Sequence, residues 1–345
     1  MAEDPSLADL GEWELINRLA RFAPEGQFAD DAALVDLPWV ADRSSGPLVI
    51  TTDVLVDTVH FSDATTAPGD VGWRAASASL SDLAAMGCRR ALGLTVALVA
   101  PISTRWSWVE GVYQGMAEAL RASGGTLLGG DCSSGSQRIL SITAAGWIDP
   151  KAGGPLRRSD GRPGDLLVST GPHGLSRLGL ALLRHEPLSG VEAPQAQLAA
   201  SLRRRAENAH RRPTARFDAI EVMAGSRPHG QPWRVGGCDS SDGLAAAVSA
   251  IAGASGCSAL LDQKRLPIVE GMGTLPQAES WCLGGGEDFE LILALDPAWA
   301  QRLITDLEGS SLIGELVPRG SEPPLRWKHS ELEIDPRWRG YSHFR

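Results

Sequence analysis

Residues 235–254 read VGGCDSSDGLAAAVSAIAGA, and this stretch indicates the fold class of the chain. Val235 to Cys238 predicts a strand, and the run from Asp242 to Ala254 predicts a helix. Two carboxylates and two hydroxyls stand at their junction, where the N-terminus of a helix attracts phosphate. Ser241 or Asp242 could also be an ordinary N-cap, and the two roles are compatible. A strand, a polar turn and a helix in this order predict an α/β or α+β protein.

Aspartate recurs beside tight turns and apolar runs along the rest of the chain. Leu48 to Thr52 predicts a strand that delivers Asp53 at its end, and Asp82 lies inside a helix predicted from Asp70 to Gly87. A carboxylate at the edge of an apolar run is costly to desolvate unless a cation meets it. Mg²⁺ prefers oxygen ligands and commonly bridges carboxylates to substrate phosphates. A Mg-dependent enzyme that handles a nucleotide is therefore predicted from the segments Ala29 to Ala33, Thr51 to Val54, Ser81 to Leu83, Gly129 to Asp131, Asp239 to Gly243 and Gly284 to Asp288.

Most of these motifs also have an ordinary structural interpretation. Adjacent aspartates, strand-end aspartates and repeated glycines are all common in plain turns. A histidine between apolar neighbours, such as His60, is usually a hydrogen-bonded structural residue, and Arg158 lies in a polar segment where an arginine is usually solvated. Asp82 differs, because an aspartate in the middle of a helix gains nothing from capping and is a poor helix former. A functional role is favoured for Asp82.

Length and composition restrict the class of protein. A chain of 345 residues is too long for one typical core, so two domains are expected. The segment from Asp149 to Gly164 is rich in Gly, Pro and charge, which places the predicted domains at residues 1–150 and 151–345. A net charge of −10 argues against a nucleic-acid partner. No segment is apolar enough to span a membrane, and the acidic N-terminus predicts no signal peptide.

The five cysteines have no CxxC spacing, which favours reduced thiols in the cytoplasm over disulfides or a zinc site. The common nucleotide-binding signatures are also missing, since neither a GxxxxGK[ST] loop nor a GxGxxG turn after a strand occurs. There is no GxSxG or HExxH motif either. A phosphotransferase with this sequence would therefore have an uncommon architecture.

In their order, the motifs resemble those of thiamine-monophosphate kinases, which belong to the aminoimidazole ribonucleotide synthetase-like superfamily. The resemblance covers nearly the whole chain. Thr58 stands where this family usually has Gly, as does Ala29, while Ser79 replaces Asn and Cys132 replaces Thr. The linker motif is altered at residues 160–162, and no carboxylate of the family pattern is lost. The matching segments are Ala29 to Ala33, Thr51 to Asp53, Val59 to Phe61, Ser79 to Gly87, Gly129 to Cys132, Arg158 to Asp165, Asp239 to Leu244, Gly285 to Leu291 and Trp338 to Phe344.

The resemblance implies ATP-dependent phosphorylation of thiamine monophosphate to thiamine diphosphate, by direct in-line transfer assisted by several Mg²⁺ ions. It implies a two-domain fold whose N-terminal mixed sheet pairs in a homodimer and whose C-terminal α/β sandwich completes the nucleotide and substrate sites. The implied metal-binding residues are Asp30, Asp31, Thr51, Thr52, Asp53, Asp82, Asp131, Asp239 and Asp242. The implied ATP contacts are Tyr113, Gly130, Asp131, Arg158 and Ser241, and the implied substrate contacts are His60, Glu287 and Tyr341. No covalent nucleophile is expected.

Two other interpretations remain open from the sequence. The first is another ATP-using enzyme of the same superfamily, but selenophosphate synthetase would need a reactive Cys near the N-terminus and the hydrogenase-maturation dehydratase a C-terminal Cys. The first cysteine here is Cys88, and the chain ends at His343, Phe344 and Arg345. The second is a non-catalytic nucleotide-binding scaffold. Clustered carboxylates repel one another without a metal, which argues against a scaffold that has kept them all.

Overall fold

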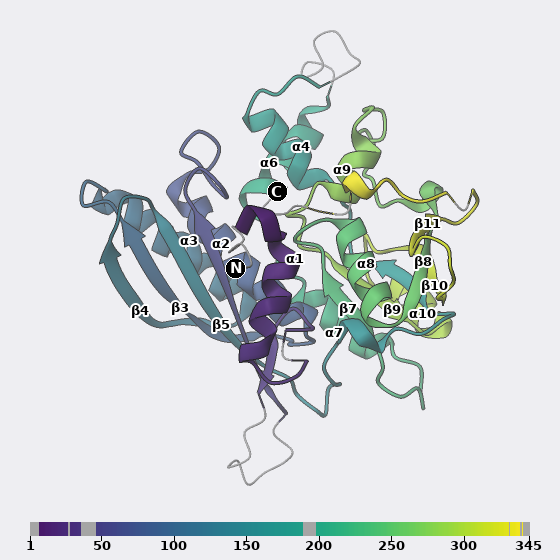
Figure 1. Ribbon diagram of the computed structural model, residues 1–345. Helices are drawn as coiled ribbons and strands as arrows, with labels where there is room; N and C mark the ends of the chain where they lie inside the picture. Colours follow the sequence, from purple (N-terminus) through teal and green to yellow (C-terminus); the bar gives the residue numbers. More distant parts are fainter. Residues whose placement is uncertain are drawn as a thin grey trace, which may run out of the picture.

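The computed structural model describes residues 7–26, 28–35, 46–188, 198–330, 332–338 and 340. Within these residues it is a mixed α/β protein with a five-stranded and a six-stranded sheet, as the sequence predicts (Figure 1). The first sheet has the order β1-β2-β5-β3-β4 and the second β11-β8-β10-β6-β9-β7. The two sheets follow one another along the sequence, and the segment predicted as a linker carries only the short 3-10 turn η2 at Arg158–Asp160.

The strands of the first sheet are antiparallel except for the parallel pair β3 and β4. Helices α2 and α3 run along one face of this sheet, where the buried side chains of β3 and β5 point. The two helices approach closely, because a Cβ on Gly115 would lie 1.8 Å from the carbonyl oxygen of Gly69. The elements are α1 Leu7–Leu19, β1 Ala33–Val35, β2 Leu48–Val56, α2 Pro68–Ala85, β3 Ala91–Ala100, α3 Trp106–Ser123, β4 Thr126–Ser134 and β5 Ile139–Trp147.

The second sheet is covered on both faces. Alternate residues of β9 enter different cores: Leu293 packs with α7 and α10, whereas Ile292 and Ala294 pack with α8. This alternation follows from the period of two along a strand. The elements are β6 Leu166–Ser169, α4 Leu175–Leu183, α6 Ala200–Arg211, α7 Phe217–Ser226, β7 Gly236–Asp239, α8 Leu244–Ala254, β8 Cys257–Leu261, α9 Ala278–Gly284, β9 Leu291–Leu295, α10 Pro297–Asp306, β10 Ser311–Pro318 and β11 Leu325–Trp327.

Three local predictions were wrong in detail. Asp53 lies inside β2 and not at its end, because the strand continues through Val56. Helix α2 begins at Pro68 and not at Asp70, which lies in its first turn. The alternative interpretation of Gly129 and Gly130 as a plain turn is also wrong, because strand β4 runs through both residues as far as Ser134. The membrane prediction agrees with the helices that the structure describes, since none is long and apolar enough to cross a bilayer.

Candidate functional site

Four aspartates from distant parts of the sequence meet between the two sheets. Asp31 precedes β1, Asp53 lies in β2, Asp82 in α2 and Asp239 at the end of β7. Each of the last three accepts a short hydrogen bond from a hydroxyl group. Thr51 Oγ1 donates to Asp82 at 2.5 Å, Ser79 Oγ to Asp53 at 2.7 Å and Ser81 Oγ to Asp239 at 2.7 Å. The contact of Ser81 with Asp239 joins α2 to the second sheet.

The carboxylates of this cluster disfavour each other's charge. The pKa of Asp31 is raised to about 7, chiefly by burial and also by the charge on Asp239, although Arg158 acts in the opposite direction. The pKa of Asp82 lies well above its usual value, because of burial first and of the charges on Asp53, Asp239 and Asp31 second. Burial also raises the pKa of Asp53, together with the charge on Asp239. Without a cation, the site therefore holds more negative charge than its surroundings stabilise.

Arg158, the first residue of η2, places one positive charge beside the cluster. The guanidinium of Arg158 pairs with Asp31, and the backbone N–H of Arg158 donates to Asp30 Oδ1 at 2.8 Å. The predicted linker arginine is thus only partly exposed, and it fixes both aspartates of the Asp30-Asp31 pair. A guanidinium in this position presents further N–H donors that suit a phosphate group.

The donor set of the cluster fits a hard divalent cation. Asp31 Oδ2 is buried and has no hydrogen-bond partner among the described residues, although Asp31 Oδ1 is paired with Arg158. A buried carboxylate oxygen without a partner is costly unless an ion or water meets it. Donor atoms of Asp31, Cys238 and Asp239 lie within 4.8 Å of one another. Burial raises the pKa of the Cys238 thiol well above its usual range, so the carboxylates are the ligands that suit Mg²⁺ here.

Other predicted metal and nucleotide residues lie outside this cluster. Thr52 is exposed and bonds to the Thr143 hydroxyl at 2.5 Å, so its side chain points away from Asp53 and Asp82. Gly130 and Asp131 lie on the exposed strand β4. Tyr113 on α3 lies beside Cys132, the residue that follows Asp131 on β4. Burial and the Cys132 thiol together raise the pKa of Tyr113. The structure therefore places Tyr113, Gly130 and Asp131 in a second group at the edge of the first sheet.

The residues between β7 and α8 differ in their exposure and in their contacts. Ser241 Oγ donates to Asp239 Oδ1 at 2.9 Å, which ties this hydroxyl to the carboxylate cluster. Asp242 is exposed. The N-cap of α8 is Gly243, with φ 112°, and neither Ser241 nor Asp242 caps this helix. Neither side chain therefore serves as the N-cap of α8, and that of Ser241 bonds to the carboxylate cluster instead.

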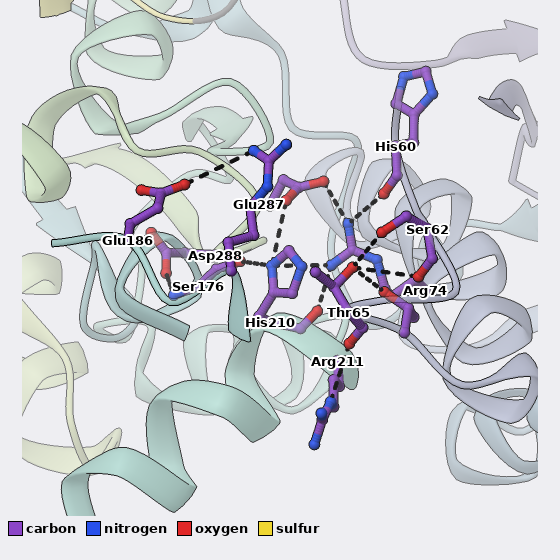
Figure 2. Close-up of polar contacts among 12 residues, drawn as sticks. His60, Ser62, Thr65, Arg74, Ser176, Glu186, His210, Arg211, Glu287 and Asp288 are labelled. Atoms are coloured by element: carbon purple, nitrogen blue, oxygen red, sulfur yellow. Dashed lines mark hydrogen bonds and ion pairs between the residues drawn. The ribbon is translucent and has the colours of Figure 1, made fainter. Parts of the chain in front are cut away.

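A second polar cluster joins two of the predicted substrate residues. The side chain of Arg74 is 3% exposed and donates to Glu287 Oε1 at 2.5 Å and to the backbone carbonyl of His60 at 3.3 Å (Figure 2). His210 Nδ1 lies 3.6 Å from Glu287 Oε2. Burial lowers the pKa of His210 to about 2, and the nearby Arg74 lowers it as well. His210 is therefore neutral, and Arg74 is the cation that pairs with Glu287. Tyr341, the third predicted substrate residue, lies outside the described residues.

Sequence reasoning did not identify Arg74, Ser79 or Ser81 as parts of a site. Arg74 interrupts a run of small residues on the buried side of α2, and a charged residue in such a place is a detectable signal. The two serines gave no signal of their own, because their partners Asp53 and Asp239 are distant in sequence.

Comparisons with known proteins identify the family to which this fold belongs. A family model described as AIR synthase related protein, N-terminal domain, matches residues 29–148. The fold and the carboxylate-rich site therefore define an AIR synthase-related protein. The thiamine-monophosphate kinase of Prochlorococcus marinus is 43% identical over 94% of this chain and 93% of its own length. The thiamine-monophosphate kinase of Synechococcus elongatus is also 43% identical, over 99% of this chain and 98% of its own. The chain belongs to the thiamine-monophosphate kinase family.

Solved structures of the same family share the fold. The structure of AaThiL complexed with AMPPCP and TMP has a TM-score of 0.81 and 26% sequence identity, and the match covers 99% of this chain and 100% of that one.

Proposed function

We propose that the protein transfers the γ-phosphoryl group of ATP to thiamine monophosphate and so forms thiamine diphosphate. Two close relatives carry the name of this activity. AaThiL, which has the same fold, has been solved with TMP and with AMPPCP, an analogue of ATP. The observation that carries the proposal is the convergence of Asp31, Asp53 and Asp82 on Asp239, which brings oxygen ligands from both sheets to one place.

The chemistry of the reaction explains this choice of residues. The attacking atom is a phosphate oxygen that is already ionised at neutral pH, so the protein needs no strong general base. The obstacle is the repulsion between two polyanions. We infer that Asp31, Asp53, Asp82 and Asp239 hold Mg²⁺, with Asp30, Thr51, Asp131 and Asp242 as further ligands in the substrate complex. The side chain of Thr52 points away from this cluster, so Thr52 would contribute its backbone carbonyl oxygen. Bound Mg²⁺ would neutralise phosphate charge and align the attacking and leaving oxygens.

The residues of the chain then have separate tasks. Arg158 presents N–H donors to the nucleotide phosphates beside Asp31, and Ser241 presents a hydroxyl at the start of α8. Tyr113 and Gly130 would contact the nucleotide from the edge of the first sheet. His60 and Glu287 would bind the acceptor together with Tyr341. Transfer is direct, because no described residue of the cluster is an activated nucleophile; the thiol of Cys238 is held protonated by burial.

A homodimer is part of the proposal, and the first sheet supports it. The face of this sheet opposite α2 and α3 carries exposed side chains of β2 and β3, among them Val54 and Leu92. Exposed apolar side chains that gather on one sheet face mark an interaction surface. Pairing of two such faces would bury them through the first 150 residues of each chain, the predicted N-terminal domain. The five free cysteines agree with the proposed cytoplasmic setting.

The activity can be tested directly. The purified protein is incubated with ATP carrying a label in its γ-phosphate, with Mg²⁺ and thiamine monophosphate, and the products are separated by chromatography. We expect labelled thiamine diphosphate in amounts equal to ADP, no label on the protein, and no product with EDTA. A folded protein that binds ATP and forms no thiamine diphosphate would contradict the proposal and favour the scaffold interpretation.

A further inference from the structure

Arg74 connects three segments that are far apart in the sequence. Its guanidinium donates to the carbonyl oxygen of His60 in the loop after β2, to that of His210 in α6, and to the carboxylate of Glu287 before β9 (Figure 2). The same nitrogen, Nη2, contacts both His60 and Glu287. A single buried donor therefore sets the distance between two residues that we propose bind the acceptor.

Two of the three partners of Arg74, His60 and Glu287, are themselves held in defined orientations. His60 Nδ1 accepts a hydrogen bond from the backbone N–H of Val56 at 3.0 Å, so the neutral ring carries its proton on Nε2. Glu287 has a left-handed backbone with φ 57°, and its N–H donates to the carbonyl oxygen of Ser241 at 2.7 Å. A non-glycine residue in this conformation persists only when its surroundings enforce it. The ion pair with Arg74 supplies such a constraint from the side chain of Glu287.

The side chain of Arg74 lies beneath the acceptor residues and is closed off from solvent. It is 3% exposed, whereas that of Glu287 is 34% exposed. A ligand that reaches Glu287 from solvent would therefore not meet Arg74. Any effect of Arg74 on the reaction would pass through Glu287 and the His60 loop.

We propose that Arg74 is a positioning residue, which fixes Glu287 and the His60 loop in the arrangement that binds thiamine monophosphate. This inference rests on the proposed function. The planar guanidinium with its fork of donors can meet the two carbonyls and the carboxylate together, whereas a lysine ammonium on a flexible stem cannot hold all three in the same geometry. The role is specific to the acceptor, because among the residues that the structure describes the Arg74 guanidinium contacts His60, His210 and Glu287 and neither of the proposed nucleotide residues Arg158 and Ser241. Glu287 reaches Ser241 through a backbone hydrogen bond that does not involve Arg74.

Steady-state kinetics of Arg74→Lys test the proposal. We expect the KM for thiamine monophosphate to rise about tenfold or more, while the KM for ATP stays within about twofold of the wild-type value. The melting temperature and the affinity for AMPPCP report whether the variant is folded. Equal changes in both KM values, or no change in either, would overturn the proposal.

Arg212→Lys is the matched control. Arg212 is the residue that follows α6, and like Arg74 it joins α6 to α2. It contacts Asp70 of α2 at 2.6 Å and Glu118 of α3 at 2.7 Å, but no contact of Arg212 with His60 or Glu287 occurs in the described part of the chain. We expect this variant to keep both KM values. If Arg212→Lys raised the KM for thiamine monophosphate as much as Arg74→Lys, a general loosening of the contact between the sheets would explain both, and Arg74 would have no special role.

A double-mutant cycle with Glu287→Gln separates action through Glu287 from a purely structural role. If Arg74 acts through Glu287, the effects of Arg74→Lys and Glu287→Gln on binding of thiamine monophosphate are not additive. Additive effects would overturn the inference. Failure of the proposed function has a different signature, since the wild-type protein would then neither bind thiamine monophosphate nor form thiamine diphosphate.

Discussion

At the scale of single residues, the charged form of Asp82 is electrostatically unfavourable, and a bound cation would stabilise it. Its carboxylate is buried in α2, and the charges of three other aspartates add to the effect of burial on its pKa. Within the described part of the chain, the hydroxyl of Thr51 is the one contact of Asp82 that favours its charged form. A residue of this kind destabilises the metal-free protein. When a cation binds, the destabilisation is removed, and this favours binding.

Asp82→Asn should therefore separate stability from activity. We expect the variant to melt at a higher temperature than the wild type in EDTA, because one repelling charge is gone. Its kcat/KM should fall at least about 100-fold, and Mg²⁺ with ATP should raise its melting temperature less than that of the wild type. Differential scanning fluorimetry and the kinase assay measure the two effects. Full activity in a folded Asp82→Asn protein would show that the cluster is not the metal site.

Asp288 gives a second residue-scale prediction, on pH. Its carboxylate accepts the N–H groups of Gly174 and Ser176 at 2.7 and 3.0 Å, and burial raises its pKa to about 7. Since this pKa is higher folded than unfolded, the folded state binds more protons between about pH 4 and 7. The contribution of Asp288 to stability is therefore present at low pH and is lost as pH rises through about 7.

Urea unfolding between pH 4 and 8 checks this sign. The free energy of unfolding of the wild type should decline with pH more steeply than that of Asp288→Asn, by at most about 1.4 kcal/mol per pH unit. The comparison concerns the slope, because Asn also changes the hydrogen bonds to Gly174 and Ser176. Parallel curves for the two proteins would contradict the raised pKa.

At the scale of elements, the contact of α2 with α3 determines where the site residues lie. Helix α2 carries Arg74, Ser79, Ser81 and Asp82, and it lies directly against α3 at Gly115. We expect Gly115→Ala to destabilise the protein by roughly 3 kcal/mol, because its Cβ would overlap the backbone of α2. Gly253→Ala in α8 is the control, since a Cβ there meets nothing within 4 Å. Chemical denaturation should show a loss for the first variant and none for the second.

The elements also show which predictions the sequence supports. Helix α3 ends at Gly124 in a left-handed C-cap, and β3 and β5 follow long apolar runs, so local patterns are enough to predict these three elements. The position of Asp53 inside β2 was not predictable in this way, because the carboxylate is satisfied by Ser79 from another element. Arg74 was missed for the same reason, since its acceptors lie 14 to 213 residues away. Contacts of this kind depend on tertiary structure that no local pattern reports.

At the scale of the whole molecule, the exposed face of the first sheet predicts the oligomeric state. Val54 is 44% exposed in the middle of β2. Val54→Glu would place a charge in the proposed dimer interface, where no partner is prepared for it, and should yield monomers. Ile102→Glu, at a position 96% exposed outside this sheet face, should leave the dimer intact. Sedimentation equilibrium distinguishes the two, and a wild-type monomer would contradict the proposed assembly.

The distribution of thiols has a practical consequence for studying this enzyme. Cys132 is exposed on β4, while Cys88, Cys238, Cys257 and Cys282 are buried. A maleimide dye should therefore attach at one place without any engineered cysteine, and mass spectrometry would find a single adduct. The dye would be attached to β4, the strand that contains Gly130 and Asp131. A change in its fluorescence emission would then report nucleotide binding in real time.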